Sequence, residues 1–478
     1  MEILSSEIYE KKVRPVKVLQ FGEGNFLRAF IDWFFQKFND EADFNGGIVV
    51  VQPLPQGRIS ELSQQNGLYT LVLEGIQNDE LKKEKQVIDV LEDFVNPYTD
   101  YSSFLNYAKN PELKMIVSNT TEAGIILNEN DIDDTVVSDS YPGKLLSFLK
   151  FRYDFFDGDP DKGFFIVPCE LIDFNGSKLK DILNQLSHLR HYSDSFIHWL
   201  NTANLYYNTL VDRIVPGYPA DNITKLEKEN GYKDHNIVKG ELFHLWVVEG
   251  DKKIRQFIPI DSVHLNIVLT DNVKPYKERK VKILNGAHTC MVPIAYQYGI
   301  DTVGQMMETK PLCSFLEQFL QQEVWPTLKL PQSEKETFTK DVMERFKNPT
   351  IHHKLLTISL NSMSKYKTRV LPSAIEYYNI THNLPKHCLF SLSALFVMFS
   401  LKNEDGTSLI QDNPEFINFW HTEWKKQDIS TIAEDALSLK HWEYDFSTMK
   451  GSKECVINYI QDIQSIGIIE ALQKNFNL

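Results

Sequence analysis

An apolar stretch that runs directly into a glycine turn constrains the fold of this chain more than any other feature. Residues 16–21 are predicted to form a buried strand, and Gly22-Glu23-Gly24 follow at once. A helical pattern over 26–38 begins immediately after this turn. This order places backbone N–H groups and the positive end of a helix beside an anion. It is typical of sites that bind the pyrophosphate of a dinucleotide.

Strand and helix patterns alternate through the first part of the chain. Strands are predicted at 16–21, 47–51, 67–73, 85–94, 114–118 and 163–168, with helices at 26–38, 99–109, 143–153 and 177–188. A last strand is expected at 264–270. The alternation predicts an α/β fold, a Rossmann-type doubly wound and mostly parallel sheet.

The character of the sequence changes after Pro275. Long helical patterns follow, at 276–298, 310–324, 391–400, 413–426 and 455–475. A chain of 478 residues is also too long for a single core. We therefore expect a dinucleotide-binding domain over 1–273 and a mainly helical domain over 274–478 that binds substrate and carries catalysis.

Composition excludes several classes of protein. The net charge of −15 argues against nucleic-acid binding, which needs a basic face. The five cysteines lie far apart and fit neither a disulfide framework nor a zinc site. The first residues lack the pattern of a signal peptide, and no apolar run is long enough to span a membrane. A cytoplasmic protein without a metal site or a membrane partner is expected.

The dinucleotide fingerprint is incomplete in two places. Leu27 stands where the third glycine is usual, and that glycine serves close helix–strand packing. Gln52 follows the second strand, where a carboxylate usually binds the ribose of NAD, and Arg58 could attract a 2′-phosphate. The residues alone therefore leave NAD and NADP open, and an ordinary strand–helix turn remains the alternative.

A second group of residues surrounds the start of the helical region. Five basic residues crowd one helix start, with only Glu278 to offset their charge: Lys274, Lys277, Arg279, Lys280 and Lys282. Cations at a helix N-terminus oppose the macrodipole and favour neutral lysine, which a lysine general base requires. Asn285 and His288 share a helix face, and Lys280 lies roughly 80° around from His288.

Gly286 follows Asn285 inside this predicted helix. Glycine there costs about 1 kcal/mol relative to alanine, which indicates a close approach or a site. A solvated basic face with a buried histidine is the alternative interpretation of the whole group.

Several motifs together carry a family resemblance. They are residues 20–30, 65–71, 118–124, 141–144, 168–176, 280–288 and 360–372. In this order they resemble the mannitol dehydrogenase family of long-chain polyol dehydrogenases. Within it, they are similar to the branch that reduces keto-hexuronates. Leu171 replaces the asparagine of the mannitol-type enzymes, which favours the uronate branch.

The resemblance implies an NAD-dependent oxidoreductase of hexuronate catabolism that needs no metal. It implies that Lys280 is the acid/base and that Asn285 and His288 complete the catalytic group. The cofactor-binding residues that it implies are Phe21, Gly22, Glu23, Gly24, Asn25, Phe26, Arg28, Gln52, Asn119 and Thr120. A sugar-acid substrate needs a partner for its carboxylate, and Lys365 and Arg369 are the candidates, with Lys367 nearby. Glu170 is a further candidate for substrate binding.

Alternatives remain within and outside this class. The substrate could be a different keto-hexuronate or a neutral polyol, since these differ only in configuration or charge. Outside the class, the chain could be a dinucleotide sensor without catalysis. A monomer is the default that the family implies.

Overall fold

The computed structural model describes residues 1–120, 123–476 and 478, so Thr121 and Glu122 of the 118–124 motif lie outside the described residues. The chain divides into two compact units. Unit 1 comprises 1–75 and 81–273, and unit 2 comprises 76–80 and 274–478. The division is discontinuous, whereas the sequence predicts two continuous segments. No helix of the described residues is long and apolar enough to cross a membrane.

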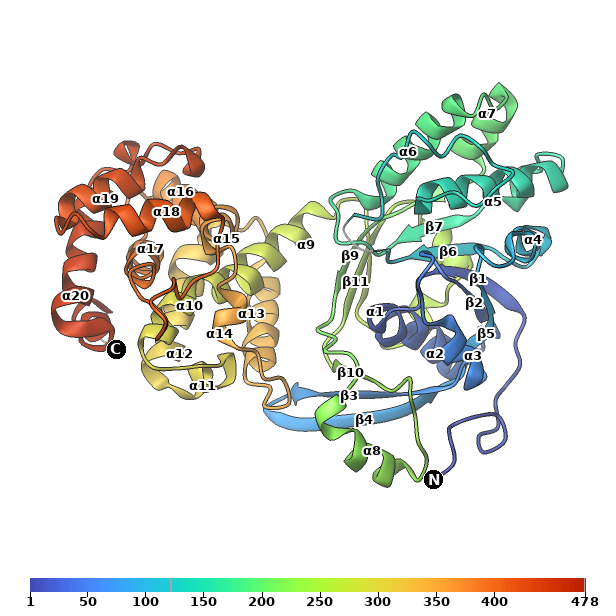
Figure 1. Cartoon of the computed structure of the whole chain (residues 1–478), viewed down its shortest axis with the longest axis horizontal. Coiled ribbons are helices and arrows are strands. Elements are labelled where there is room, and N and C mark those ends of the chain that lie inside the picture. Colours follow the sequence, from blue (N-terminus) through green and yellow to red (C-terminus); the bar gives the residue numbers. More distant parts are fainter. Residues whose placement is uncertain (121–122, 477) are drawn as a thin grey trace. The chain divides into compact units, whose positions relative to one another are not determined.

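A parallel sheet of six strands forms the centre of unit 1. Its strands are β1 (Val16–Phe21), β2 (Gly47–Val51), β5 (Leu91–Val95), β6 (Met115–Ser118), β7 (Phe165–Pro168) and β8 (Leu205–Tyr206). They lie in the order β5-β2-β1-β6-β7-β8, with every neighbouring pair parallel (Figure 1). The order reverses between β1 and β6, where doubly wound sheets bind ligands. The predicted Rossmann-type fold is confirmed.

The side chains of the sheet alternate between two cores. Val18 and Val50 pack in one core with α1 (Asn25–Ala29) and α2 (Ile31–Ala42). Leu19 and Val51 point to the other face. The helices of that second core are α4 (Tyr101–Asn106), α5 (Tyr141–Phe155), α6 (Asn175–Leu189) and α7 (Asp194–Thr202). Neighbouring strand residues point to opposite faces, so an unbroken apolar run such as 47–51 fits a sheet covered on both sides.

Two smaller sheets belong to unit 1, apart from residues 76–80, which belong to unit 2. One holds β3 (Tyr69–Gln77), β4 (Glu80–Ile88) and β10 (Val238–Glu241), and the other holds β9 (Asn208–Asp212), β11 (Leu245–Glu249) and β12 (Ile267–Thr270). The predicted strands at 67–73 and 264–270 therefore form, but outside the main sheet. Helices α3 (Ile59–Gln64) and α8 (Ile223–Asn230) belong to the connections.

The helix predicted over 26–38 is divided at Phe30. This residue has φ −127° and ψ −77°, which separates α1 from α2. Side chains that lie far along the chain donate hydrogen bonds to the last carbonyl groups of α1. The Tyr69 hydroxyl donates to the Arg28 carbonyl oxygen at 2.7 Å, and Arg213 donates to that of Ala29. These bonds replace those that a continuous helix would make.

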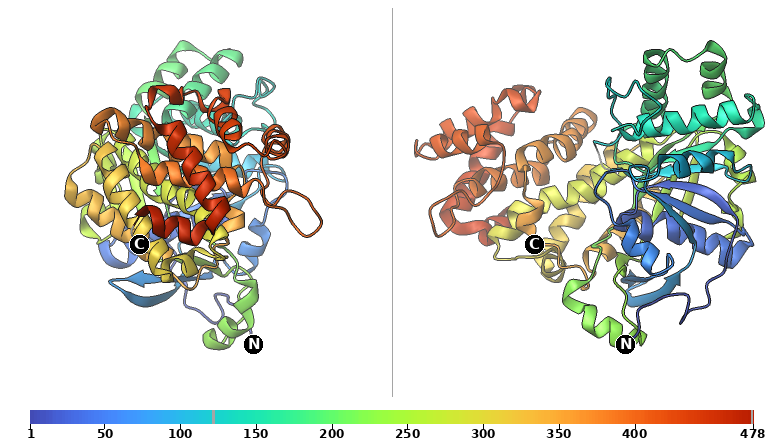
Figure 2. Two further views of the ribbon diagram at one scale, coloured as in Figure 1. Left: turned by 90° about the vertical axis from the view of Figure 1, so that its left-hand side faces the viewer. Right: turned by 45° about the vertical axis from the view of Figure 1, so that its right-hand side comes forward.

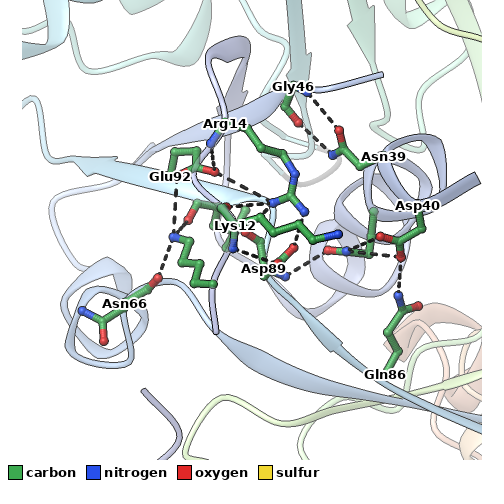
Figure 3. A network of polar contacts seen from close by, with 12 residues as sticks. Lys12, Arg14, Asn39, Asp40, Gly46, Asn66, Gln86, Asp89 and Glu92 are labelled. Atoms are coloured by element: carbon green, nitrogen blue, oxygen red, sulfur yellow. Dashed lines mark hydrogen bonds and ion pairs between the residues drawn. The ribbon is translucent and has the colours of Figure 1, made fainter. Parts of the chain in front are cut away.

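The segment before β1 is held by buried ion pairs. Arg14 contacts Asp89 at 2.8 Å, and its backbone N–H donates to Glu92 at 3.0 Å (Figure 3). The Gln36 side chain of α2 accepts from the backbone N–H of Asp89 at 2.9 Å. This network fixes the entry to β1, and therefore the strand that leads into the glycine turn.

Unit 2 is built of helices apart from the short 76–80 segment (Figure 2). Its helices are α9 (Lys274–Arg279), α10 (Gly286–Gln297), α11 (Val303–Glu308), α12 (Lys310–Gln318), α13 (Gln332–Phe346), α14 (Leu355–Ile358), α15 (Ser362–Arg369), α16 (Leu371–Thr381), α17 (Lys386–Met398), α18 (Pro414–Glu423), α19 (Ile429–Leu437) and α20 (Ser452–Phe476). The predicted helical character of this region is confirmed. π-helical segments at Lys280–Asn285 and Phe319–Val324 were not predicted.

Candidate functional site

The glycine turn lies at the point where the strand order reverses. Gly22 has φ +122°, which favours glycine. A Cβ atom at Gly22 would stand 3.1 Å from the Asn119 carbonyl oxygen and 3.1 Å from Leu27 Cδ1. The backbone N–H of Asn119 donates to the Phe21 carbonyl oxygen at 3.1 Å. Conformation and space therefore both require glycine at this position.

Gly24 begins α1 and leaves open backbone in front of the turn. No described side chain caps this helix start. A Cβ atom at Gly24 would meet no protein atom within 4 Å, so it would fill only the open space there. Uncapped N–H groups beside such space suit the pyrophosphate of a dinucleotide. Asn25 and Phe26 form the first residues of the helix.

Leu27 explains how the turn tolerates a missing third glycine. Its side chain is buried in the core and lies against Gly22. The helix–strand contact is therefore filled by a leucine side chain instead of a close backbone approach, and the turn itself is preserved.

Arg28 is a buried residue that holds this turn from inside. Its guanidinium group donates to the Glu23 carbonyl oxygen at 3.1 Å and to Asn25 Oδ1 at 2.6 Å. It also donates to the Asn236 carbonyl oxygen and lies over the Tyr69 ring. Burial lowers the pKa of Arg28. The structure thus gives Arg28 a structural role at the turn, and a direct cofactor contact stays a prediction.

Gln52 follows β2, and Arg58 precedes α3. The Gln52 amide nitrogen donates to the carbonyl oxygens of Leu54 and Pro55, at 2.8 and 3.1 Å. Arg58 is exposed and pairs with Glu61 at 2.5 Å. Its backbone N–H donates to the Glu23 carboxylate at 3.1 Å. Gln52 therefore shapes its own loop, and Glu61 offsets the charge that would attract a 2′-phosphate.

Glu170 is tied to the end of β6. The Ser118 hydroxyl donates to one of its carboxyl oxygens at 3.0 Å. The backbone and hydroxyl of Thr120 donate to the other, at 3.0 and 2.9 Å. The side chain is buried, which raises its pKa. Glu170 thus holds the loop that carries Asn119 and Thr120, and its predicted contact with substrate receives no support from this geometry.

Lys280 and Asn285 are the first and last residues of a π-helical segment. Such segments carry an extra residue in a turn and recur at functional sites. The rotation of 100° per residue, used to place Lys280 relative to His288, does not hold across this segment. Both residues are half-buried, and α10 follows directly with His288 in its first turn.

Two of the basic residues around Lys280 pair with carboxylates, some of which lie far along the chain. Lys282 is buried, and its ammonium group lies 2.7 Å from Glu278 and 2.8 Å from Glu376. Arg279 lies 3.6 Å from Glu334. The sequence indicated only Glu278 as an offset, because the other two carboxylates lie far along the chain. The charge of this helix start is therefore offset by more carboxylates than the local sequence indicates.

Gly286 marks a close approach, as its position in the helix indicated. A Cβ atom there would stand 3.1 Å from the Arg369 carbonyl oxygen and 3.4 Å from that of Val281. The interpretation as a close approach is confirmed. The start of α10 thus packs against the end of α15, which brings the lysine segment and the 360–372 motif together.

His288 is a buried neutral imidazole. Its ring stacks on Phe346 with centroids 4.2 Å apart and meets the His353 ring edge-on at 5.1 Å. Burial lowers its pKa well below the ordinary range, and the nearby His353, Arg345, Arg369 and Lys365 lower it further. Its Nε2 atom has no hydrogen-bond partner among the described residues. A polar atom in that state is available to a ligand.

The predicted cations of α15 separate into two groups. Lys365 and Arg369 are four residues apart, so they share a helix face. The charges of both lower the pKa of His288. Lys365 donates to the Ile358 carbonyl oxygen at 2.8 Å, whereas no described residue forms a hydrogen bond or ion pair with the Arg369 guanidinium. Lys367 instead pairs with Glu443 at 2.8 Å.

Three neighbours of His288 escaped the sequence interpretation: Arg345, Phe346 and His353. In the sequence, His352 and His353 are adjacent, a spacing that does not fit a zinc site. Within the described residues, no group of three His, Cys, Asp or Glu side chains could hold a metal ion. The adjacent histidines drew attention to His353 in the sequence. No local pattern connected His353 to α10, which carries His288 and begins more than sixty residues earlier.

The sheet order and the glycine turn define a dinucleotide-binding fold of the Rossmann type, joined in one chain to a helical unit with a lysine, asparagine and histidine group. The comparisons with known proteins narrow this class. Residues 16–262 match the mannitol dehydrogenase Rossmann domain, and residues 272–465 match the mannitol dehydrogenase C-terminal domain. The chain belongs to the mannitol dehydrogenase family, as its motifs indicated.

Curated relatives and solved structures extend across the whole chain. Altronate oxidoreductases of Escherichia coli K12 and Shigella flexneri are 39% identical over 480 residues, 99% of each chain. A substrate-free D-sorbitol dehydrogenase shares the fold with a TM-score of 0.83 and 21% identity, over 98% of this chain and all of that one. A Pseudomonas fluorescens mannitol 2-dehydrogenase, solved with NAD and D-mannitol, has a TM-score of 0.70 and 18% identity over 99% of both chains.

Proposed function

We propose that this protein is an NAD-dependent altronate oxidoreductase, also called tagaturonate reductase, which interconverts D-tagaturonate and D-altronate. The observation that carries the proposal is the Lys365–Arg369 pair beside His288, in a chain whose full-length relatives are altronate oxidoreductases. Two cations on one helix face, one of them without a described acceptor, suit the carboxylate of a sugar acid.

The reaction divides between a hydride and a proton. A bound nicotinamide supplies the hydride that reduces the ketone carbon. Lys280 gives a proton to the developing alkoxide and takes it back in the oxidation direction. Asn285 donates a hydrogen bond to the same oxygen and stabilises its charge.

His288 orients a substrate hydroxyl group. Its neutral imidazole has one N–H donor and one acceptor nitrogen, so it can donate to or accept from a hydroxyl without adding charge. Phe346 and His353 fix the ring plane, which restricts the direction of this contact.

Unit 1 holds the dinucleotide in this proposal. The Gly22-Glu23-Gly24 turn and the start of α1 receive the pyrophosphate, and Asn119 and Thr120 follow the neighbouring strand at the switch point. NAD is preferred to NADP because Glu61 offsets Arg58, and the Pseudomonas relative was solved with NAD. A 2′-phosphate would have to compete with Glu61 for the guanidinium group.

A spectrophotometric assay with NADH and NADPH tests the proposal. We expect the highest kcat/KM with tagaturonate and NADH, and lower values with fructuronate and fructose. Faster reduction of fructuronate would make the protein a fructuronate reductase, and a preference for fructose would indicate a neutral polyol dehydrogenase. NADH binding without turnover of any keto substrate would favour the non-catalytic sensor. A cytoplasmic monomer stays a prediction, which cell fractionation and light scattering test.

A further inference from the structure

A buried carboxyl group belongs to the side chains that hold the glycine turn. Asp32 lies in the first turn of α2 and is 0% exposed. Gln20 of β1 and Tyr69 of β3 contact its carboxyl group, and Arg28 of α1 is the charged group that acts on it. The chemistry proposed above does not use Asp32. The role that we assign to Asp32 below rests on the proposed function, in which the glycine turn binds a dinucleotide.

The hydrogen bonds around Asp32 match a protonated carboxyl group. Tyr69 has one hydroxyl hydrogen but two acceptors within reach, the Arg28 carbonyl oxygen at 2.7 Å and Asp32 Oδ2 at 3.0 Å. Asp32 Oδ1 and Gln20 Oε1 are both buried and lack a donor among the described residues. An ionised carboxylate only accepts, whereas a protonated one supplies the missing donor. Full burial raises the pKa of Asp32 to about 7.

The same side chains hold two carbonyl groups of the turn. Gln20 Nε2 donates to the Gly22 carbonyl oxygen at 3.1 Å, and Arg28 Nε donates to that of Glu23 at 3.1 Å. Ionisation of Asp32 would place a charge beside Gln20 and Arg28. Both are donors, so each would be drawn from the turn toward the carboxylate.

The other charged groups that act on Arg28 are already engaged. Asp234 accepts from the Gln65 amide at 2.9 Å and from the backbone N–H of Thr70 at 2.6 Å. Arg58 pairs with Glu61 at the surface. Neither Asp234 nor Arg58 offers Asp32 a new partner. Arg28 is therefore the cation that would move toward Asp32 when Asp32 is ionised.

We propose that Asp32 is a positioning residue for the cofactor. Its protonated carboxyl group keeps Gln20 and Arg28 on the carbonyl groups of the Gly22-Glu23-Gly24 turn, and its ionisation weakens dinucleotide binding. Asparagine reproduces the protonated form, because its amide supplies a donor without a charge. Alanine removes the contact with both Gln20 and Tyr69.

NADH titrations followed by fluorescence between pH 6 and 8.5 test this role in the full-length chain. We expect the wild-type dissociation constant to rise about tenfold over this range, as expected for binding linked to one proton. The Asp32→Asn variant should keep the low-pH affinity throughout, and Asp32→Ala should bind about tenfold more weakly at every pH. Glu41→Gln is the matched control on the exposed part of α2 and should follow the wild type.

Two results would overturn the proposal. One is a wild-type dissociation constant that does not change with pH. The other is an Asp32→Asn variant that folds, by circular dichroism, but loses affinity as Asp32→Ala does. If neither the wild type nor Glu41→Gln binds NADH, dinucleotide binding itself fails. Urea unfolding of wild type and Asp32→Asn against pH then still reports whether Asp32 is protonated in the folded chain.

Discussion

Gly286 and Arg369 meet so closely that the carbonyl oxygen of Arg369 lies 3.1 Å from where a Cβ atom of residue 286 would stand. This contact joins the helix that carries His288 to the helix that carries Lys365 and Arg369. The proposed acid/base segment and the proposed carboxylate site therefore meet at this backbone contact. Disturbing it should affect both.

Replacing Gly286 by alanine should destabilise the protein by about 1–3 kcal/mol, because the added methyl group overpacks against backbone. Urea unfolding followed by tryptophan fluorescence measures the change. Gly304→Ala is the control, since a Cβ atom at Gly304 in α11 meets nothing within 4 Å and alanine favours helix. Equal stability of the two variants would contradict the close approach.

Lys280→Ala should lower kcat by about 10²–10⁴-fold at neutral pH, because general acid–base catalysis contributes that much. NADH binding, measured by fluorescence, should remain within twofold of wild type. Lys277→Ala lies one turn earlier and removes the same charge, so it serves as the control. Near-normal turnover of Lys280→Ala would remove this lysine from the proposed mechanism.

Arg369→Ala should raise KM for tagaturonate by about 10–100-fold, in line with 1.5–3 kcal/mol for a hydrogen bond to a charged group. Steady-state kinetics with a neutral ketose should show little change in KM. Lys367→Ala provides the comparison, because that lysine pairs with Glu443. If both substrates suffered equally, a role for Arg369 in binding the carboxylate would be wrong.

Stability should depend on pH through Asp32. Its pKa is raised from 3.8 to about 7, so between these values the folded chain binds more protons than the unfolded chain. The free energy of unfolding should therefore fall as pH rises from about 4 to about 7, by roughly 4 kcal/mol in total. Asp32→Asn removes this contribution. In urea unfolding, the free energy of unfolding of the variant relative to wild type should be higher at pH 8 than at pH 5. The same relative value at both pH values would contradict the raised pKa.

Local patterns predicted much of the fold. The apolar run at 47–51 and the strand ending at Phe21 were recognisable because a strand buried on both faces needs an unbroken apolar sequence. The helix over 26–38 was predicted without its break, because the break depends on Tyr69 and Arg213, which lie far along the chain. The strands at 67–73 and 264–270 were predicted, but the sheets that they join were not. Those sheets are set by partner strands that lie elsewhere in the chain.

The residues of the candidate site also divide into those with a local signal in the sequence and those that depend on distant partners. Gly22, Gly286 and the lysine segment carried local signals, since a glycine in a turn or helix interior has few structural reasons to be there. The partners of Glu170 could not be predicted locally, because Ser118 ends another strand and Thr120 follows that strand. The surroundings of His288 were missed because Phe346 and His353 reach it only through the packing of unit 2.

The π-helical segment from Lys280 to Asn285 has a consequence for engineering. A designer who copied the lysine, asparagine and histidine spacing onto a straight α-helix would keep the sequence and lose the alignment, because the underwound turn contributes part of the rotation between Lys280 and His288. Deleting a single residue within the segment should convert it to regular helix, because a π turn holds one residue more than an α turn. The spacing of this motif can therefore be transplanted only together with its irregular backbone.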